Sequence, residues 1–261
     1  MAGAITVIIL IFSILVGLMY HEYGHMKVAK KHGIKVNQYV IGFGKPFISR
    51  RGKDGTSYGV APLPFGGYCD IDDTELNASS TGTYVSVMCA GIVRNVIFGI
   101  LLFIIGSLII AQRILTPAEL FHVISGLVSS VWESVGTFLT SLFDIKGMAY
   151  NGGFITQMGT VSTQTNVMTE PLHYTVGLAF FYGGIMNLFI AIFNALPIPA
   201  IDGGQVVVRL VCDISKKVFG HIINPRTINV INVVFFSALI VYQGVILMMD
   251  IPVFRNFILN L

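Results

Sequence analysis

The sequence has little charge for its length. Charged residues make up 11% of the 261 residues and hydrophobic residues make up 54%, whereas soluble domains carry roughly 25% charged residues. This composition excludes a disordered chain and argues against an ordinary soluble domain. The mean hydropathy of +0.78 indicates a membrane protein.

Cysteine and concentrated basic charge are also scarce. The three cysteines share no close spacing, so the sequence offers neither a disulfide framework nor a four-sulfur zinc site. The 16 lysines and arginines are scattered and leave a net charge of only +3, whereas nucleic-acid binding usually needs one basic face. We therefore expect no nucleic-acid partner, and we expect any metal to be held by other ligands.

Long uncharged runs predict an all-α polytopic membrane protein with four transmembrane helices. A helix needs about 20 apolar residues to cross the hydrocarbon core. We predict spans at about residues 2–25, 90–112, 172–196 and 228–249. The first run lacks the basic start and the small-residue cleavage site of a secretory signal peptide, so we interpret it as a span.

The distribution of basic residues predicts the orientation of these spans. Lysine and arginine gather in segments 27–83 and 203–227, whereas segment 113–172 holds only Arg113 and Lys146. Cytoplasmic loops are enriched in these residues. We therefore predict a multi-pass protein of the inner or plasma membrane, with both termini outside and with loops one and three in the cytoplasm.

Residues 118–143 carry an apolar stripe at helical spacing, with polar residues such as Glu119 and Glu133 on the other face. A fifth crossing there is conceivable, but it would put the two basic segments on opposite sides of the membrane. We predict an amphipathic helix that lies along the outer interface.

The first cytoplasmic loop, residues 34–70, is predicted to contain a small membrane-associated sheet. It is rich in β-branched and aromatic residues, and Asp54-Gly55 supplies a hairpin turn. A soluble hairpin with flexible turns is an equally good interpretation of the composition. Several glycines suggest close backbone approach or a dip toward the bilayer: Gly42, Gly44, Gly66 and Gly67.

The end of the first predicted span carries His21-Glu22-Tyr23-Gly24-His25, which matches the H-E-x-x-H pattern. On a helix, His21 and His25 project from one side and can bind one Zn²⁺, while Glu22 lies beside them as a base that is not a ligand. A polar helix end that meets water is the alternative. It is disfavoured because these groups extend an apolar span and need partners at that depth.

A catalytic zinc site has three protein ligands, so one more ligand must come from elsewhere. Asp202 is the candidate, because it follows an apolar span that Pro197 and Pro199 break, and broken helices at membrane depth line protein or a wet cavity. An aspartate that caps a following helix is the alternative. The remaining histidines and a second acidic group are interpreted as surface or solvated-loop residues: His32, His122, His173, His221, Asp70, Asp72, Asp73 and Glu75.

These motifs resemble those of the site-2 protease family, the zinc intramembrane proteases. The resemblance extends from residue 1 to about 210, and the chain most resembles the bacterial branch that clears anti-sigma factors. It departs from that branch at Ile92, where proline is usual, and in having too short a segment between the second and third spans for PDZ domains. The matching segments are His21-Glu22-x-x-His25, Gly42-Phe43-Gly44-Lys45, Pro64-Phe65-Gly66-Gly67-Tyr68, Ala90-Gly91-x-x-x-Asn95 and Asn194-x-x-Pro197-x-Pro199-x-x-Asp202-Gly203.

The resemblance implies a zinc-dependent endopeptidase that acts within the membrane, with Zn²⁺ on His21, His25 and Asp202 and with Glu22 as the catalytic base. Its partners would be the lipid bilayer and single-span membrane proteins, such as an anti-sigma factor or a signal-peptide remnant. The family assigns substrate binding to an asparagine at the position of Asn194. Further residues predicted to bind substrate are Gly42, Phe43, Gly44, Gly66, Gly67 and Asn95.

A substrate helix keeps its carbonyls in internal hydrogen bonds, so it must unwind before cleavage. The predicted sheet offers an edge to which an extended substrate can add. A metal transporter with the same ligands is the main alternative function, but it needs ionisable groups across the bilayer, and segments 95–112 and 228–249 contain none. A catalytically inactive scaffold is the third interpretation, which the intact Glu22 disfavours.

Overall fold

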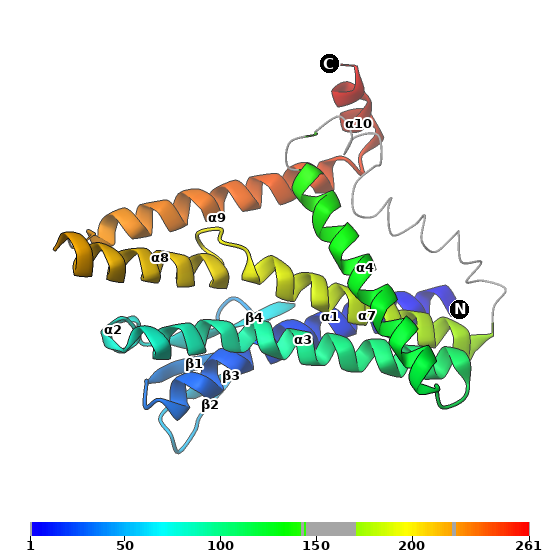
Figure 1. Cartoon of the computed structure of the whole chain (residues 1–261), viewed down its shortest axis with the longest axis horizontal. Coiled ribbons are helices and arrows are strands. Elements are labelled where there is room, and N and C mark those ends of the chain that lie inside the picture. The colour runs from blue at the N-terminus through cyan, green and yellow to red at the C-terminus, as the bar shows by residue number, and fades with distance from the viewer. Residues whose placement is uncertain (1, 142–143, 145–170, 221–222, 261) are drawn as a thin grey trace.

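The structure is a computed structural model that describes residues 2–141, 144, 171–220 and 223–260. Three long helices form a central bundle with mutual contacts (Figure 1): α1 (Ala2–Lys31), α3 (Thr81–Ala111) and α7 (Leu172–Ala195). Together with α9 (Pro225–Met248), they are the four described helices that are long and apolar enough to cross a membrane. The expected set of four apolar helices is therefore present.

The ends of these helices follow local signals. Gly33, with φ of +75°, ends the first helix and donates its N–H to the carbonyl of Lys30. The hydroxyl of Ser80 accepts from the N–H of Thr83 and caps α3. This cap places the start of α3 at Thr81, earlier than the predicted span 90–112, because the helix continues beyond the most apolar residues.

Glycines bring α3 and α7 into backbone contact. A Cβ atom added to Gly184 would lie 2.6 Å from the carbonyl oxygen of Gly99, and one added to Gly177 would lie 3.0 Å from that of Gly106. Small residues at such contacts let two membrane helices approach closely. The core of the bundle therefore depends on the absence of side chains at these positions.

The first loop forms a four-stranded sheet at the end of α1 opposite the N terminus (Figure 1). The strands lie in the order β2-β3-β1-β4, so β4 is an edge strand. β1 pairs parallel with β3 and antiparallel with β4, and Asp54-Gly55 lies in the turn between β2 and β3. The strand bounds are β1 Val36–Phe43, β2 Ile48–Arg51, β3 Ser57–Val60 and β4 Leu63–Ile71.

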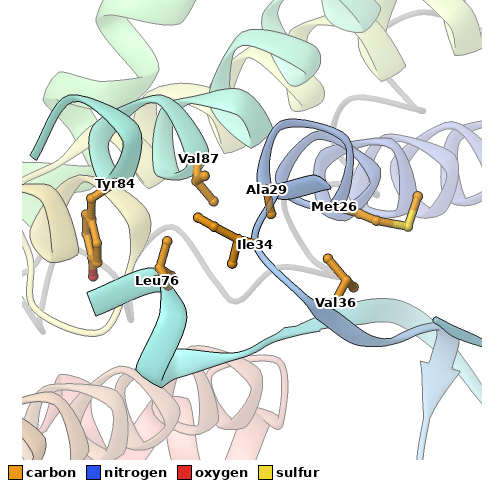
Figure 2. Packing of buried hydrophobic residues seen from close by; sticks show 7 residues of the cluster. All are labelled: Met26, Ala29, Ile34, Val36, Leu76, Tyr84 and Val87. Carbon is orange, nitrogen blue, oxygen red and sulfur yellow. The ribbon is translucent and has the colours of Figure 1, made fainter. Parts of the chain in front are cut away.

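A buried cluster joins the sheet to the helices (Figure 2). It takes side chains from the end of α1, from β1, from the short helix α2 (Asp73–Ala78) and from the start of α3. The hydroxyl of Tyr39 also donates to the carbonyl of Met19 at 2.8 Å. The cluster consists of Met26, Ala29, Ile34, Val36, Leu76, Tyr84 and Val87.

The acidic group is ordered secondary structure, which corrects its interpretation as a solvated loop: Asp70 lies in β4, Asp72 caps α2, and Asp73 and Glu75 lie in α2. The Asp72 carboxylate caps α2 by accepting from the N–H groups of Thr74 and Glu75. Glu75 in turn accepts from the N–H of Lys35 at 2.7 Å. The carboxylates of Asp72 and Glu75 therefore satisfy backbone donors that would otherwise lack partners.

The remaining helices lie around the bundle. Helix α4 crosses it obliquely (Figure 1), and its buried Leu127 contacts the cluster of Phe103 and Leu188. This helix covers the predicted segment 118–143 up to residue 141, and its place at the outer interface stays a prediction. The bounds are α4 Pro117–Ser141, α8 Asp202–Ile214, η1 Ser215–Phe219 and α10 Pro252–Leu259.

Candidate metal centre

His21, His25 and Asp202 meet at the point where α1, α3 and α8 come together. The Oδ2 atom of Asp202 lies 3.0 Å from Nε2 of His21 and 3.3 Å from Nε2 of His25. The two Nε2 atoms are 3.0 Å apart. Both histidines are 6% exposed, so two ring nitrogens and one carboxylate oxygen converge in a buried place.

The chain between α7 and α8 brings Asp202 to the histidines. Helix α7 ends at Ala195, before the prolines, and Ala200 takes a left-handed conformation with φ of 80°. A Cβ atom added to Gly203 would lie 2.6 Å from the carbonyl oxygen of Leu196. The glycine after Asp202 therefore lets the start of α8 pack directly on the end of α7.

Helix α3 supports the two imidazoles from the other side. The Nδ1 atom of His25 lies 2.8 Å from the carbonyl oxygen of Val87, and because a carbonyl only accepts, Nδ1 carries the proton. In the neutral ring Nε2 then has its lone pair free for a metal. A Cβ atom added to Gly91 would lie 2.5 Å from Nε2 of His25 and 2.6 Å from Nε2 of His21, so only glycine fits beneath the rings.

The three ligand atoms fit a divalent metal of the zinc type. Zinc bonds of about 2.0–2.2 Å at tetrahedral angles place ligand atoms about 3.3–3.5 Å apart, close to the separations of 3.0 and 3.3 Å. Apart from the two imidazole nitrogens, the buried Oδ2 of Asp202 has no polar partner among the described residues. A buried carboxylate needs a cation nearby, which a metal on the three ligands would be.

Glu22 lies beside the three ligands and is held by the sheet. Its Oε2 atom accepts the N–H of Cys69 in β4 at 3.0 Å. Glu22, His25 and Asp202 all line one cavity of about 260 Å³. One carboxylate oxygen is thus fixed by the backbone, in a cavity that the candidate ligands share.

The thiol of Cys69 lines the same cavity. Burial, together with the nearby negative charge of Glu22, raises the pKa of this thiol to about 12. Cys69 is therefore a neutral thiol at physiological pH. Its backbone N–H, and not its sulfur, is the group that contacts Glu22.

The glycines predicted to bind substrate gather at one end of the sheet. Gly42, Gly44 and Gly66 all have positive φ values, of 88°, 103° and 123°. A Cβ atom added to Gly66 would lie 3.2 Å from the Phe43 ring and 3.7 Å from Leu18 of α1. This end of the sheet therefore lies beside α1 about one turn before His21.

The two predicted asparagines occupy different surroundings. Asn194 is half-buried near the end of α7, and its Nδ2 donates to the carbonyl of Ile190 at 3.0 Å. Asn95 is fully buried in α3, and neither of its amide atoms has a hydrogen-bond partner among the described residues. Asn194 thus lies near the end of α7, and its amide oxygen takes no part in that hydrogen bond. Asn95, in contrast, is enclosed in the protein.

Sequence reasoning missed two contacts that orient the site. The carbonyl of Val87 and the N–H of Cys69 are backbone groups. Every residue supplies the carbonyl, and every residue except proline supplies the N–H. No residue type marks them. The Gly91 of the second-span motif was the available signal, since an unsubstituted position beside a buried ligand pair indicates close packing.

The sequence profile described as peptidase family M50 matches residues 8–242. The chain belongs to peptidase family M50. The resemblance to site-2 proteases is thereby confirmed at the level of the family.

Individual relatives of this M50 chain carry protease names. The regulator of sigma-E protease RseP of Escherichia coli (strain K12) is 31% identical over 144 residues, which cover 44% of this chain and 32% of the relative. A putative zinc metalloprotease of Vibrio cholerae is 33% identical over 155 residues, 48% of this chain and 34% of the relative. The alignments thus span about a third of the length of these curated relatives.

Proposed function

We propose that the chain is a zinc-dependent intramembrane endopeptidase that hydrolyses peptide bonds within or near the transmembrane helices of single-span proteins. The proposal is carried by the convergence of His21, His25 and Asp202 at separations of 3.0–3.3 Å. Membership of peptidase family M50 and relatives named as zinc metalloproteases support it. His21 and His25 lie in α1, which is apolar enough to cross a membrane, and Asp202 lies at the start of α8, shortly after the apolar helix α7.

The chemistry is divided between a metal and a base. Zinc held by His21, His25 and Asp202 would supply a Lewis acid for the scissile carbonyl and would lower the pKa of the attacking water. Glu22 takes one proton from the attacking water as the water oxygen bonds to the carbonyl carbon. Glu22 then passes this proton to the leaving nitrogen as the C–N bond breaks. The N–H of Cys69 holds Oε2 of Glu22, which leaves Oε1 for this transfer.

The edge of β4 is the proposed receiver for an unwound substrate. In a strand, successive residues point their N–H and C=O groups alternately to one side of the strand and to the other. The N–H of Cys69 points to Glu22 and not to β1. The backbone of Gly67, two residues earlier, therefore also faces away from β1. A substrate that adds as a strand regains hydrogen bonds there, with its carbonyl beside Glu22.

The sheet glycines and Asn194 complete the proposed substrate site. Gly42, Gly44 and Gly66 have positive φ values, and Phe43 is 45% exposed beside them. The Oδ1 atom of Asn194 is an acceptor for a substrate N–H, because its Nδ2 is engaged within α7. Asn95 differs from these residues, because it is fully buried.

The distribution of basic residues supports a site near the cytoplasmic side of a cell membrane, with both termini outside. The proposed substrates are single-span membrane proteins, and the two candidates are an anti-sigma factor and a signal-peptide remnant. Relatives named as regulators of sigma-E favour the former. PDZ-type gating is not part of the proposal.

The test is to coexpress the protein, or its Glu22→Gln variant, with tagged single-span candidate proteins. Wild type should give a shortened fragment, and Glu22→Gln should slow its formation by about 10²–10⁴-fold because the base is lost. The variant should still bind zinc, since Glu22 is not a ligand. Glu133→Gln, at an exposed position of α4, is the matched control and should cleave normally. Cleavage at the wild-type rate by Glu22→Gln would contradict the mechanism.

A further inference from the structure

Helix α8, which begins with Asp202, buries little apolar side-chain area. The apolar side chains of α8 are largely open, with Leu210 41%, Val211 50% and Ile214 56% exposed. Gly204 is the buried residue of this helix. Burial of these apolar side chains therefore adds little to how α8 keeps its position, and its polar contacts add to the backbone packing at Gly203 and Gly204.

Arg209 makes most of these polar contacts. Its Nη1 donates to the carbonyl of Asn77 and its Nη2 to the carbonyl of Ser79, both at 2.8 Å. Its Nε donates to Asp213 at 3.0 Å, and its guanidinium lies 5.2 Å from the centre of the Tyr84 ring. The side chain is only 15% exposed, and each of its three guanidinium nitrogens donates a hydrogen bond.

Asp213 extends the contact to the start of α3. Its Oδ2 atom accepts the hydroxyl of Thr81 at 2.5 Å as well as Nε of Arg209. The Thr81 hydroxyl, with Arg209, holds the pKa of Asp213 below its ordinary value. The carboxylate is therefore charged at neutral pH, and its bond to Nε keeps the guanidinium turned toward the carbonyls of Asn77 and Ser79.

Arg209 lies on the same face of α8 as Asp202. Seven residues separate them, which is nearly two helical turns of about 3.6 residues each. The carbonyls that Arg209 holds belong to the end of α2, where a helix carries partial negative charge. A displacement of α8 along this face would therefore move Asp202 and break the arginine contacts together.

The surface that Arg209 holds also orients His25. Tyr84, under the guanidinium, belongs to the same buried cluster as Val87 (Figure 2). The carbonyl of Val87 accepts from Nδ1 of His25. The buried cluster that contains Tyr84 and Val87 thus contacts His25 directly and is linked to Asp202 through Arg209.

We propose that Arg209 is a positioning residue that fixes α8 on the corner between α2 and α3 and so holds the Asp202 carboxylate at the two imidazoles. This inference rests on the proposed function, in which Asp202 is the third metal ligand. Substitutions of residues that orient metal ligands typically reduce metal affinity by about 10–100-fold. Arg209→Ala should have an effect of this size on zinc affinity.

The experiment measures zinc affinity of the purified full chain by competition with a chromophoric chelator, and the melting temperature of the metal-free form. Arg209→Ala should bind zinc about 10–100-fold more weakly. Arg209→Lys should be intermediate, because an ammonium cannot reach both carbonyls in a fork. Arg113→Ala is the matched control, since it removes an arginine that pairs with Glu119 in a distant segment, and should leave zinc affinity unchanged.

A double-mutant cycle separates positioning from general stability. In an Asp202→Ala background, Arg209→Ala should have no further effect on zinc affinity, because no carboxylate is left to position. Equal losses in both backgrounds, or an Arg209→Ala protein that binds zinc within about twofold of wild type, would overturn the proposal. If Arg209→Ala does not fold, Thr81→Val serves in the same cycle, with a smaller expected loss.

The result for Asp202→Ala alone tests the proposed function separately. Wild-type zinc affinity in that variant would overturn the assignment of Asp202 as a ligand, and with it both proposals. A large loss in Asp202→Ala with none in Arg209→Ala and Thr81→Val would overturn only the role of Arg209.

Discussion

The inner helices and α9 are alike in composition and opposite in packing. The most apolar 18-residue stretch has a mean hydropathy of 2.1 in α1, 2.4 in α3, 2.0 in α7 and 2.2 in α9. The inner three share buried contacts, whereas no residue of α9 is buried. Figure 1 shows α9 outside the central bundle. Apolar character thus selects helices that can enter a membrane, but it does not select which helices pack together.

Small and polar residues make the difference. The inner helices meet through glycines whose added Cβ atoms would lie within 3.0 Å of a facing backbone, as at Gly184 and Gly177. In α9, an added Cβ at Gly244 would meet nothing within 4 Å. The candidate metal centre lies in the tightly packed part, where ligand positions are fixed by backbone contact.

The largest expected effect follows from filling the space beneath the imidazoles. Gly91→Ala puts a methyl group 2.5–2.6 Å from both Nε2 atoms, so the rings must move from the metal. We expect zinc affinity to fall by at least about 10–100-fold and proteolysis to fall with it. Gly244→Ala in α9 should leave both unchanged. A Gly91→Ala protein with normal zinc content would contradict the geometry of the centre.

The next effect concerns the contact between α3 and α7. Gly184→Ala should lower the free energy of unfolding by about 1–3 kcal/mol, because the new methyl group overpacks a backbone contact. The matched Gly244→Ala change should be neutral or should stabilise by up to about 1 kcal/mol through helix propensity. Titration with a denaturing detergent measures both. Equal effects at the two positions would remove the distinction between inner and outer helices.

A smaller effect is expected from the buried amide between α1 and α7. Nδ2 of Asn187 lies 2.8 Å from the carbonyl of Gly183 and 3.3 Å from that of Ser13. Asn187→Ala should lower the free energy of unfolding by about 0.6–2 kcal/mol, as for other hydrogen bonds between membrane helices. Asn232→Ala, in α9, should have less effect. The same detergent titration compares the two, and a larger loss at Asn232 would contradict the packing.

The smallest effect concerns the outer hairpin of the sheet. Asp54 pairs with Lys30 at 2.6 Å, and this hydrogen bond lowers the pKa of Asp54 to about 2. A lowered folded-state pKa adds stability above the unfolded value of about 4, and this stability is lost as pH falls toward 2. Asp54→Asn should therefore reduce the melting temperature slightly at pH 6. The difference should shrink below pH 4, and a difference that grows in acid would contradict this.

The sequence predicted the elements more fully than their contacts. Apolar runs and the Asp54-Gly55 turn predicted the four helices and a sheet, because these signals are local. The H-E-x-x-H spacing singled out His21 and His25, and the proline-broken end of an apolar run singled out Asp202. The structure brings these three side chains together. The early start of α3 and the helix α2 were missed, because caps such as Ser80 and Asp72 lie outside the apolar pattern.

The contacts that orient the site were less predictable. The carbonyl of Val87 and the N–H of Cys69 act through backbone atoms, which carry no sequence pattern. Arg209 contacts residues about 130 positions earlier in the chain, and only the folded arrangement of α2 and α8 brings them together. Periodicity reports one helix face at a time, so contacts between distant segments stay invisible to it.

The most direct test of the account is an anomalous-scattering measurement at the zinc absorption edge on crystals of the purified protein. We predict a single strong peak within about 2.0–2.2 Å of Nε2 of His21, Nε2 of His25 and an Asp202 carboxylate oxygen. A protein loaded with zinc that shows no peak among these three side chains, or shows its peak elsewhere, would contradict the account.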